Sequence, residues 1–468
     1  MRCLRSLSLL LAMVGTACTR GSPSVRSADA APSAAPARAA ESNPLLEAST
    51  LPFQAPPFDK IHDADYQPAI ELGMQQQRAE MDSIATQTAA PTFDNTIVRM
   101  ERSGRLLARA AKVFFGVVGA NTDDTLQRVQ AAVAPKLAAH SDAIHLDDRL
   151  FRRVEQLYDH RAALGLTAEQ KFLVERYYRD FVRAGAQLSE SDKTRLRALN
   201  QEESKLTTEF QRRLLAATKA GAVVVDDRAE LAGLGDGDVA AAAEAATQRG
   251  LAGKWVLPLQ NTTLQPAQAS LENRALRERL LTASTQRAEH GDSNDTRPVV
   301  RRLAQLRAER AKLLGFPTYA AYRLDDAMAK TPEHAIKLLS DLVPAATAKA
   351  RAEAGEMQAL IDREHAGVTL APWDWQYYAE QVRKAEYDLD QSQLEPYFEL
   401  NDVLQNGVFF AAHTLYGITF RERKDIPVYQ PDVRVFEVFD ADGSPLALWY
   451  CDYFKRDNKG GGAWEDTF

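Results

Sequence analysis

From about residue 59 to residue 417, apolar residues recur at spacings of three and four, the period of an amphipathic α-helix. We expect one helical stripe to contain Ile97, Met100, Gly104, Leu107, Ala111, Phe114 and Val118. A second stripe contains Leu126, Val129, Val133 and Leu137. The pattern predicts a mainly α protein built from long helices.

Further segments with this period cover residues 269–290, 296–314, 332–365, 375–390 and 400–416. Thr167 with Gln170 has the spacing of a capping box, which marks the first turn of a helix. Ser189 with Asp192 has the same spacing, with Asp in place of the usual Glu or Gln. Both pairs predict helix N-termini.

Two regions interrupt the helical pattern. Residues 221–264 mix Gly, Asp and short apolar runs such as 223–225, which predicts a small irregular or strand-containing insertion. We therefore expect an N-terminal helical region over 43–264 and a second region over 265–468. After Pro427, alternating apolar residues flank the turn at 440–443 and predict a β-hairpin near the C-terminus.

The N-terminus has the layout of a secretory signal peptide. Arg2 and Arg5 precede the apolar run 7–14, and small residues then lead into Cys18. A Cys after small residues resembles the bacterial lipoprotein processing site, so we expect residues 1–18 to be a signal peptide with lipid on Cys18. Cleavage nearby without lipid is the alternative. Residues 19–42 are rich in Ser, Ala and Pro and predict a flexible linker. The protein is thus expected to be exported to the periplasm and, with lipid on Cys18, to be anchored to the membrane.

Charge and cysteine content limit the kinds of partner and site that the protein can have. The 468 residues contain 57 Lys and Arg against 64 Asp and Glu, a net charge of -7 without a basic stripe, which argues against a nucleic-acid partner. Of the three cysteines, only Cys451 remains once Cys3 and Cys18 are assigned to the signal region. No internal disulfide or zinc-thiolate cluster is then possible. Cys451 lies in an apolar run and is expected to be a buried structural thiol.

Known catalytic motifs are absent from the sequence. There is no phosphate-binding GxxxxGK[ST] loop, no GxSxG and no HExxH, because none of the eight histidines is followed by Glu. Two segments could still contact a ligand. The aromatic group in 373–378 could line a cleft, although core packing is favoured. The segment 460–464 (Gly460, Gly461, Gly462, Ala463 and Trp464) follows a predicted strand, and its glycines would allow close approach of an extended peptide; a mobile loop is the alternative.

Six stretches in the same order resemble the thimet oligopeptidase family of zinc metallopeptidases, and specifically its peptidyl-dipeptidase branch. They are NPLLEASTLPFQAPPFDKI from Asn43, RAEHGDSNDTR from Arg287, LLGFPTYAAYRLDDAMAKTPE from Leu313, APWDWQYYAEQVRKAEYDLD from Ala371, LEPYFELNDVLQNGVFFAAHTLYGI from Leu394 and VYQPDVRVFEVFDADGSPLALWYCDYFKRDNKGGGAW from Val428. The resemblance implies two largely helical halves around a deep channel and removal of C-terminal dipeptides from short peptides. It also implies zinc as cofactor, with HExxH downstream of the GGGAW segment.

The resemblance also defines what is missing. The chain stops at Phe468, so no zinc ligand or catalytic residue can be carried over, and we expect 265–468 to be an incomplete catalytic domain that is inactive and poorly soluble alone. What carries over is substrate contact at Gly460, Gly461, Gly462, Ala463 and Trp464. Gln430 stands where the family usually has His, so the role of that His is not carried over to this chain. The alternative function is a non-catalytic, helical peptide-binding lipoprotein.

Overall fold

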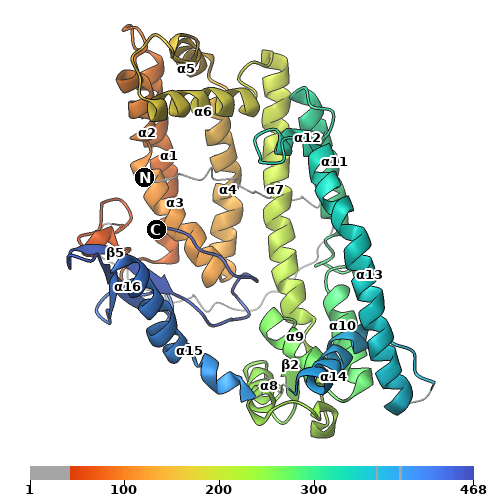
Figure 1. Ribbon diagram of the computed structural model, residues 1–468. Coiled ribbons are helices and arrows are strands. Elements are labelled where there is room, and N and C mark those ends of the chain that lie inside the picture. The colour runs from red at the N-terminus through yellow and green to blue at the C-terminus, as the bar shows by residue number, and fades with distance from the viewer. Residues whose placement is uncertain (1–42, 365–366, 389–392) are drawn as a thin grey trace, which may run out of the picture. The chain divides into compact units, whose positions relative to one another are not determined.

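The computed structural model describes residues 43–468 except 365–366 and 389–392. The predicted signal peptide, Cys18 and the linker 19–42 lie outside the described residues. The fold is mainly α with a small antiparallel sheet near the C-terminus, as predicted (Figure 1). The chain forms two compact units. The described residues of unit 1 are 43–209, 425–429 and 466–468, and those of unit 2 are the remainder of 210–465.

Neither the predicted division at residue 265 nor the channel between two halves is tested by these units, and both stay predictions. Among the described residues, no helix combines the length and the apolar character needed to cross a bilayer.

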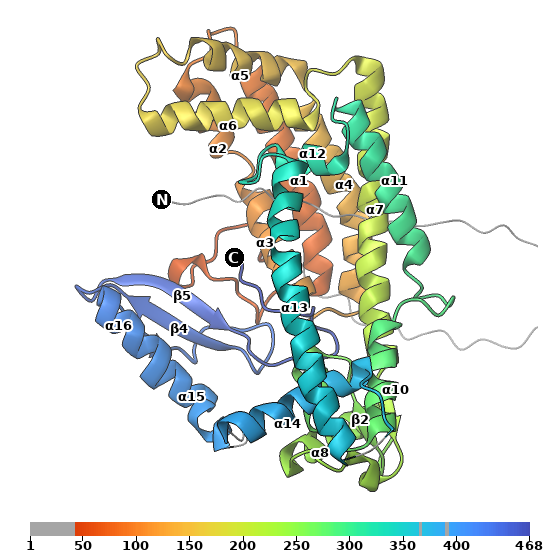
Figure 2. The same ribbon diagram turned by 45° about the vertical axis from the view of Figure 1, so that its right-hand side comes forward.

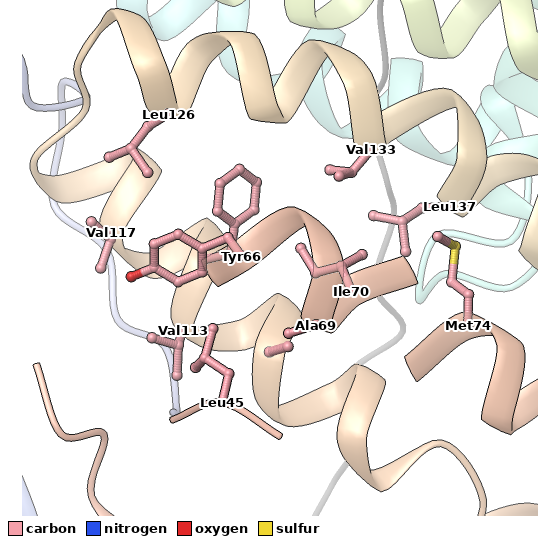
Figure 3. Packing of buried hydrophobic residues seen from close by; sticks show 12 residues of the cluster. Leu45, Tyr66, Ala69, Ile70, Met74, Val113, Val117, Leu126, Val133 and Leu137 are labelled. Atoms are coloured by element: carbon pink, nitrogen blue, oxygen red, sulfur yellow. The ribbon is translucent and has the colours of Figure 1, made fainter. Parts of the chain in front are cut away.

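Three helices pack side by side in unit 1: α1 (Asp63–Ala85), α3 (Arg105–Ala120) and α4 (Asp124–His145). Figure 3 shows how their apolar side chains meet in one cluster. Tyr66 and Phe114 lie at its centre with ring centroids 5.2 Å apart. Gly73 permits the close packing of α1 on α3, because a Cβ there would lie 2.7 Å from the backbone of Leu107.

The predicted stripe from Ile97 to Val118 does not form one helix. A π-helical turn (Phe93–Val98) and α2 (Arg99–Glu101) end before Gly104, and α3 begins at Arg105. Gly104 has φ 67°, and a Cβ there would collide with the side chain of Gln77. The single-helix prediction was wrong because the glycine on the stripe is a left-handed break that only glycine fits easily.

The rest of unit 1 comprises the 3-10 turn η1 (Pro52–Gln54), α5 (Asp148–His160), α6 (Ala168–Ala184) and the first part of α7 (Glu190–Ala220), which continues into unit 2. Both predicted N-termini are present. The Thr167 hydroxyl accepts from the Gln170 amide at 3.2 Å, and the Thr167 amide donates to the Gln170 side chain at 3.0 Å. The Ser189 hydroxyl accepts from the Asp192 amide at 3.2 Å.

A later segment of the chain completes unit 1. Asn121, at the end of α3, donates from Nδ2 to the Tyr429 carbonyl oxygen at 3.4 Å. The Tyr429 ring lies 5.3 Å from the ring of Phe58, edge to face. Residues 425–429 therefore belong with helices that precede them by about three hundred residues, a separation of 308 for Asn121 and Tyr429.

The first part of unit 2 contains the strand-bearing insertion that the sequence predicted. Strands β1 (Val223–Val225) and β2 (Trp255–Leu257) pair antiparallel. Around them lie η3 (Arg228–Leu231), α8 (Asp236–Gln248), α9 (Asn261–Ser270) and α10 (Arg274–Thr285), which share one apolar cluster. The chain continues through α11 (Arg297–Leu313) and α12 (Tyr319–Leu324) to the long helix α13 (Pro332–Glu364). Helix α14 (Trp375–Tyr387) packs against α13 after the turn η4 (Pro372–Asp374).

The last part of unit 2 is a short helical run and a three-stranded sheet. The run comprises η6 (Glu395–Phe398), α15 (Leu400–Asp402), the π-helical η7 (Val403–Phe409) and α16 (Phe410–Tyr416). The sheet has the order β3 (Thr419–Glu422), β4 (Arg434–Phe439) and β5 (Pro445–Cys451), all antiparallel, with α16 beside it (Figure 2). The hairpin of β4 and β5 was predicted, whereas β3 was not.

Candidate functional site

The candidate site starts at the edge of the three-stranded sheet. In the described residues, β5 pairs with β4 on one side only, so it is an edge strand. The backbone groups on the other side of an edge strand are free to pair with an added extended chain. The hairpin turn before β5 is closed by a bond from the Asp440 amide to the Ser444 carbonyl at 2.8 Å, which fixes the register of β5 on β4.

Two lysines organise the loop that follows β5. Lys459 is 7% exposed, and its Nζ donates to the carbonyl oxygens of Asp452 at 2.7 Å and Phe454 at 3.0 Å. The same ammonium lies 3.0 Å from the Asp452 carboxylate. Lys455 donates to the carbonyls of Lys459 and Gly460. Burial, followed by the nearby charge of Lys459, lowers the pKa of Lys455. The two ammonium groups therefore satisfy the carbonyls of a tight loop that leads into the glycines.

Two more sets of polar contacts hold this loop, one to residues outside it and one within it. The Asp457 carboxylate accepts from Arg249, which follows α8, and from the Gln260 side chain at 3.0 Å. Arg456 binds Asp452 through two nitrogens at 2.7 and 3.0 Å. The loop is thus anchored to the β1 and β2 region of unit 2 up to residue 460.

The glycine segment beyond this anchor is open. Residues 461–464 are exposed, and Gly460 is half-buried. A Cβ added at Gly461 or Gly462 would meet nothing within 4 Å, so these glycines are not required by packing. Gly462 has φ 86°, which an L side chain rarely adopts. Trp464 is 50% exposed. An exposed glycine stretch with an open aromatic ring beside it is suited to contact an approaching chain.

Two single residues that the sequence analysis raised have local structural roles. Gln430 makes a local turn, since its side-chain oxygen accepts from the Asp432 amide at 2.6 Å. Cys451 is buried at 3% exposure beside Phe436, and burial raises the pKa of its thiol, which confirms the structural role.

The aromatic group at 373–378 packs as a core, which is the interpretation that the sequence favoured over a ligand cleft. Tyr378 is buried in a cluster with Trp375 and Tyr377 against α13.

The aromatic core has a polar centre that was not predicted from the sequence. Asp374 is fully buried, and it accepts from Arg277 at 2.9 Å and from Arg274 at 2.8 Å. Arg277 is 1% exposed, donates also to the carbonyls of Leu271 and Glu272, and lies 4.3 Å over the ring of Tyr377. Burial alone raises the pKa of Asp374, but the bonds from the two arginines outweigh it and hold the pKa below its ordinary value. This cluster fixes η4 on α10.

The described residues do not fit a zinc site. Among them, no group of three or more His, Cys, Asp or Glu side chains lies close enough together to hold a metal ion. His140, for example, bonds to Gln77 through Nε2 at 2.7 Å, and His145 bonds to the Ser141 carbonyl. His365 lies outside the described residues. The described part of the chain therefore contains no ligand set for the zinc that the resemblance implies.

Comparison with known proteins finds similarity to one peptidase family. Residues 267–468 match the model of peptidase family M3. The chain is 50% identical over 426 residues to dipeptidyl carboxypeptidase of Escherichia coli and 51% identical over 426 residues to that of Salmonella typhimurium, in each case over 91% of this chain and 63% of the relative. It is 31% identical over 428 residues to oligopeptidase A of Escherichia coli, over 91% of this chain and 62% of the relative. The chain therefore spans less than two thirds of the length of these relatives.

Proposed function

We propose that this chain, whose residues 267–468 match peptidase family M3, is the peptide-binding part of an enzyme that removes dipeptides from the C-terminus of short peptides. The observation that carries the proposal is the edge strand β5 followed by the open segment 460–464. The higher identity to the dipeptidyl carboxypeptidases than to oligopeptidase A supports the dipeptide-releasing branch.

The chemistry of binding follows from these groups. An extended peptide would pair with the edge of β5 that faces away from β4 and with the backbone of the glycine segment. Gly461 has no side chain to keep the two backbones apart, and Trp464 offers a flat apolar surface to a substrate side chain. Hydrolysis needs a zinc-activated water and a general base. Among the described residues, no group of three or more His, Cys, Asp or Glu side chains could hold the zinc. The chain thus contributes binding and orientation, and we expect no peptide hydrolysis by this chain alone.

The test is the substitution Gly461→Val. A Cβ at this position would meet no atom within 4 Å, so the fold is expected to be retained, but the two methyl groups would obstruct an approaching backbone. We expect the Kd for a blocked short peptide to rise about tenfold or more, measured from Trp464 fluorescence and by calorimetry.

The matched control is Gly237→Val in α8, where an added Cβ also meets nothing within 4 Å. Equal peptide affinity in the wild type, Gly461→Val and Gly237→Val would overturn the proposed binding site. Release of dipeptides by the chain alone, measured by mass spectrometry, would contradict the proposal that this chain binds peptides but does not hydrolyse them. Peptide binding without any release, even in the full-length protein of the cell, would favour the second candidate, a non-catalytic peptide-binding lipoprotein.

We also propose that the protein is exported and anchored through lipid on Cys18. The support is the arrangement of Arg2, Arg5 and the apolar run 7–14 before Cys18. Labelling cells with a radioactive fatty acid is expected to mark the wild type and not Cys18→Ala. Label that persists in Cys18→Ala would contradict the lipid site, and retention of the unprocessed chain in the cytoplasm would contradict export.

A further inference from the structure

A pocket in unit 1 lies beside the break between α2 and α3. It has a volume of about 270 Å³ and is lined by Glu80, Ile84, Arg99, Arg102 and Ser103. The first two of these residues lie on α1, and the other three lie on α2 or directly after it, before the left-handed Gly104. Helix α2 lies next to α1 (Figure 1). The break at Gly104 therefore places two arginines against the side of α1.

The two arginines of this pocket have no acidic partner. Arg99 and Arg102 are exposed, and in the part of the chain that the structure describes neither forms an ion pair. Arg99 donates from Nη2 to the Ser83 hydroxyl at 2.9 Å, which uses one of the five N–H donors of its guanidinium. The two residues are three positions apart in helical backbone, so their like charges lie on the same side and repel each other. An anion bound to both would remove this repulsion.

The other walls of the pocket are fixed by bonds within unit 1. Glu80 supplies the only carboxylate among the lining residues, and its Oε2 accepts from the Gly104 amide at 2.7 Å. The Ser103 hydroxyl donates to the Met100 carbonyl oxygen at 2.7 Å. Ile84 is 1% exposed and provides an apolar wall. With two guanidinium groups and one carboxylate, the lining keeps a net positive charge beside an apolar surface.

A third arginine adds to the positive potential. Arg153 is 7% exposed, and burial, followed by the charge of Arg99, lowers its pKa. The hydrogen bonds of its guanidinium go to neutral acceptors, which are the carbonyls of Gln87 and Ala89 and the side chains of Asn95 and Thr96. Its Nε is buried without an acceptor among the described residues. None of these contacts supplies a negative charge that could neutralise this side of unit 1.

We propose that the pocket binds an oxyanion that carries a small apolar group, such as the carboxylate of an acylated aliphatic amino acid. Arg99 and Arg102 donate N–H bonds to the carboxylate, because the planar guanidinium fork matches its two oxygens. The apolar group lies against Ile84, and the volume of about 270 Å³ leaves room for it beside the carboxylate. The site does not depend on the segment 460–464 or on peptide hydrolysis.

The test is isothermal titration calorimetry of the whole chain with N-acetylleucine at low ionic strength. We expect saturable binding with a Kd of about 1 to 10 mM, as for a small ligand held by a few bonds. Arg102→Gln is expected to raise this Kd about tenfold or more, because the charge-assisted bonds of one guanidinium are lost. Since Arg102 is exposed and has no ion-pair partner among the described residues, the variant should unfold at the same urea concentration as the wild type.

The matched control is Arg128→Gln in α4. Arg128 is exposed and, like Arg99, donates to a hydroxyl, that of Thr125 at 2.9 Å, but it does not line the pocket. This variant should bind N-acetylleucine like the wild type. The absence of saturable binding, an unchanged Kd in Arg102→Gln, or an equal loss in Arg128→Gln would each overturn the proposal.

Two further titrations identify the ligand and the site. Inorganic phosphate has no apolar group and is expected to bind more weakly than N-acetylleucine; tighter binding of phosphate would overturn the assignment to a carboxylate. Gly461→Val should bind N-acetylleucine like the wild type. Binding that is lost in Gly461→Val and kept in Arg102→Gln would place the ligand at 460–464 instead. Failure of the anion site is therefore distinguishable from failure of the proposed peptide binding.

Discussion

Unit 1 and unit 2 differ in how completely their helices are covered. In unit 1, large exposed apolar side chains within the described residues are scattered: Leu46, Phe53, Leu164, Phe172 and Phe468. In unit 2, they form continuous sets on α13 and around α16, where Phe410, Leu415 and Tyr416 are 64% to 71% exposed. Both units contain buried clusters, so the difference is not one of core formation. It shows that a segment can have its own core and still expose a continuous apolar face.

The largest expected effect concerns the buried charge of unit 2. Asp374→Ala removes the partner of Arg277, which is 1% exposed, and leaves a buried guanidinium without its carboxylate. We expect the free energy of unfolding to fall by about 3 to 5 kcal/mol. All five tryptophans, at positions 255, 373, 375, 449 and 464, belong to unit 2, so tryptophan fluorescence in a urea titration reports on this unit.

The control for this substitution is Asp236→Ala, because the Asp236 side chain is fully exposed. It should change the free energy of unfolding by no more than about 0.5 kcal/mol. If Asp374→Ala is equally mild, the Arg277 cluster does not stabilise unit 2, and its integrity must come from apolar packing alone.

A pH-dependent effect is expected in unit 1. His140 is 6% exposed, and burial, followed by the charges of Arg78 and His145, lowers its pKa to about 4. The unfolded chain takes up this proton near pH 6.5, whereas the folded chain resists it. Neutral His140 therefore contributes at most about 3 kcal/mol to the free energy of unfolding. This contribution is fully present above pH 6.5 and is lost as the pH falls toward 4.

This contribution is measured as the difference between the wild type and His140→Gln in urea titrations between pH 7.5 and 4. On acidification, the free energy of unfolding of the variant should fall less than that of the wild type. The difference corresponds to the uptake of at most one proton on unfolding. Burial also lowers the pKa of His145, so part of the pH dependence remains in the variant. Parallel curves for both proteins would show that His140 is protonated equally in the folded and unfolded chain.

The smallest effect tests the open face of unit 2 directly. Leu342 is 59% exposed, and Leu342→Ala should change the stability of the chain alone by no more than about 0.5 kcal/mol. Leu306 in α11 of the same unit is 1% exposed, and Leu306→Ala should cost about 2 to 5 kcal/mol. Urea titrations of the two variants measure the contrast. Equal losses would mean that Leu342 is covered in solution and that unit 2 is as closed as unit 1.

The sequence predicted the elements that depend on local patterns. Helical spacing identified α4, α11 and α13, and the capping box at Thr167 marked the start of α6. The break at Gly104 was missed because a glycine on an apolar stripe has the same spacing whether or not it is left-handed. Strand β3 was missed because four residues with one large apolar side chain, Phe420, give too little alternation.

The candidate site was predictable only in part. The glycines of 460–464 can be recognised in the sequence, and the family resemblance predicted that they contact the substrate. The lysines that hold the loop are not visible in this way, because Lys455 and Lys459 look like surface charges until their carbonyl partners are known. The Arg277 and Asp374 pair spans 97 residues, and nothing local in either segment reveals the partner. Long-range polar pairing is decided by tertiary packing, on which a single sequence carries little information.

The bond between Asn121 and Tyr429 has a consequence for synthesis of the protein. The two residues are 308 positions apart, yet both belong to unit 1. At translation rates of about 5 to 20 residues per second, Tyr429 leaves the ribosome about 15 to 60 seconds after Asn121. During that interval, Phe58 lacks the aromatic ring that later packs against it. The nascent chain is therefore expected to engage chaperones late, with release only after residues 425–429 have emerged.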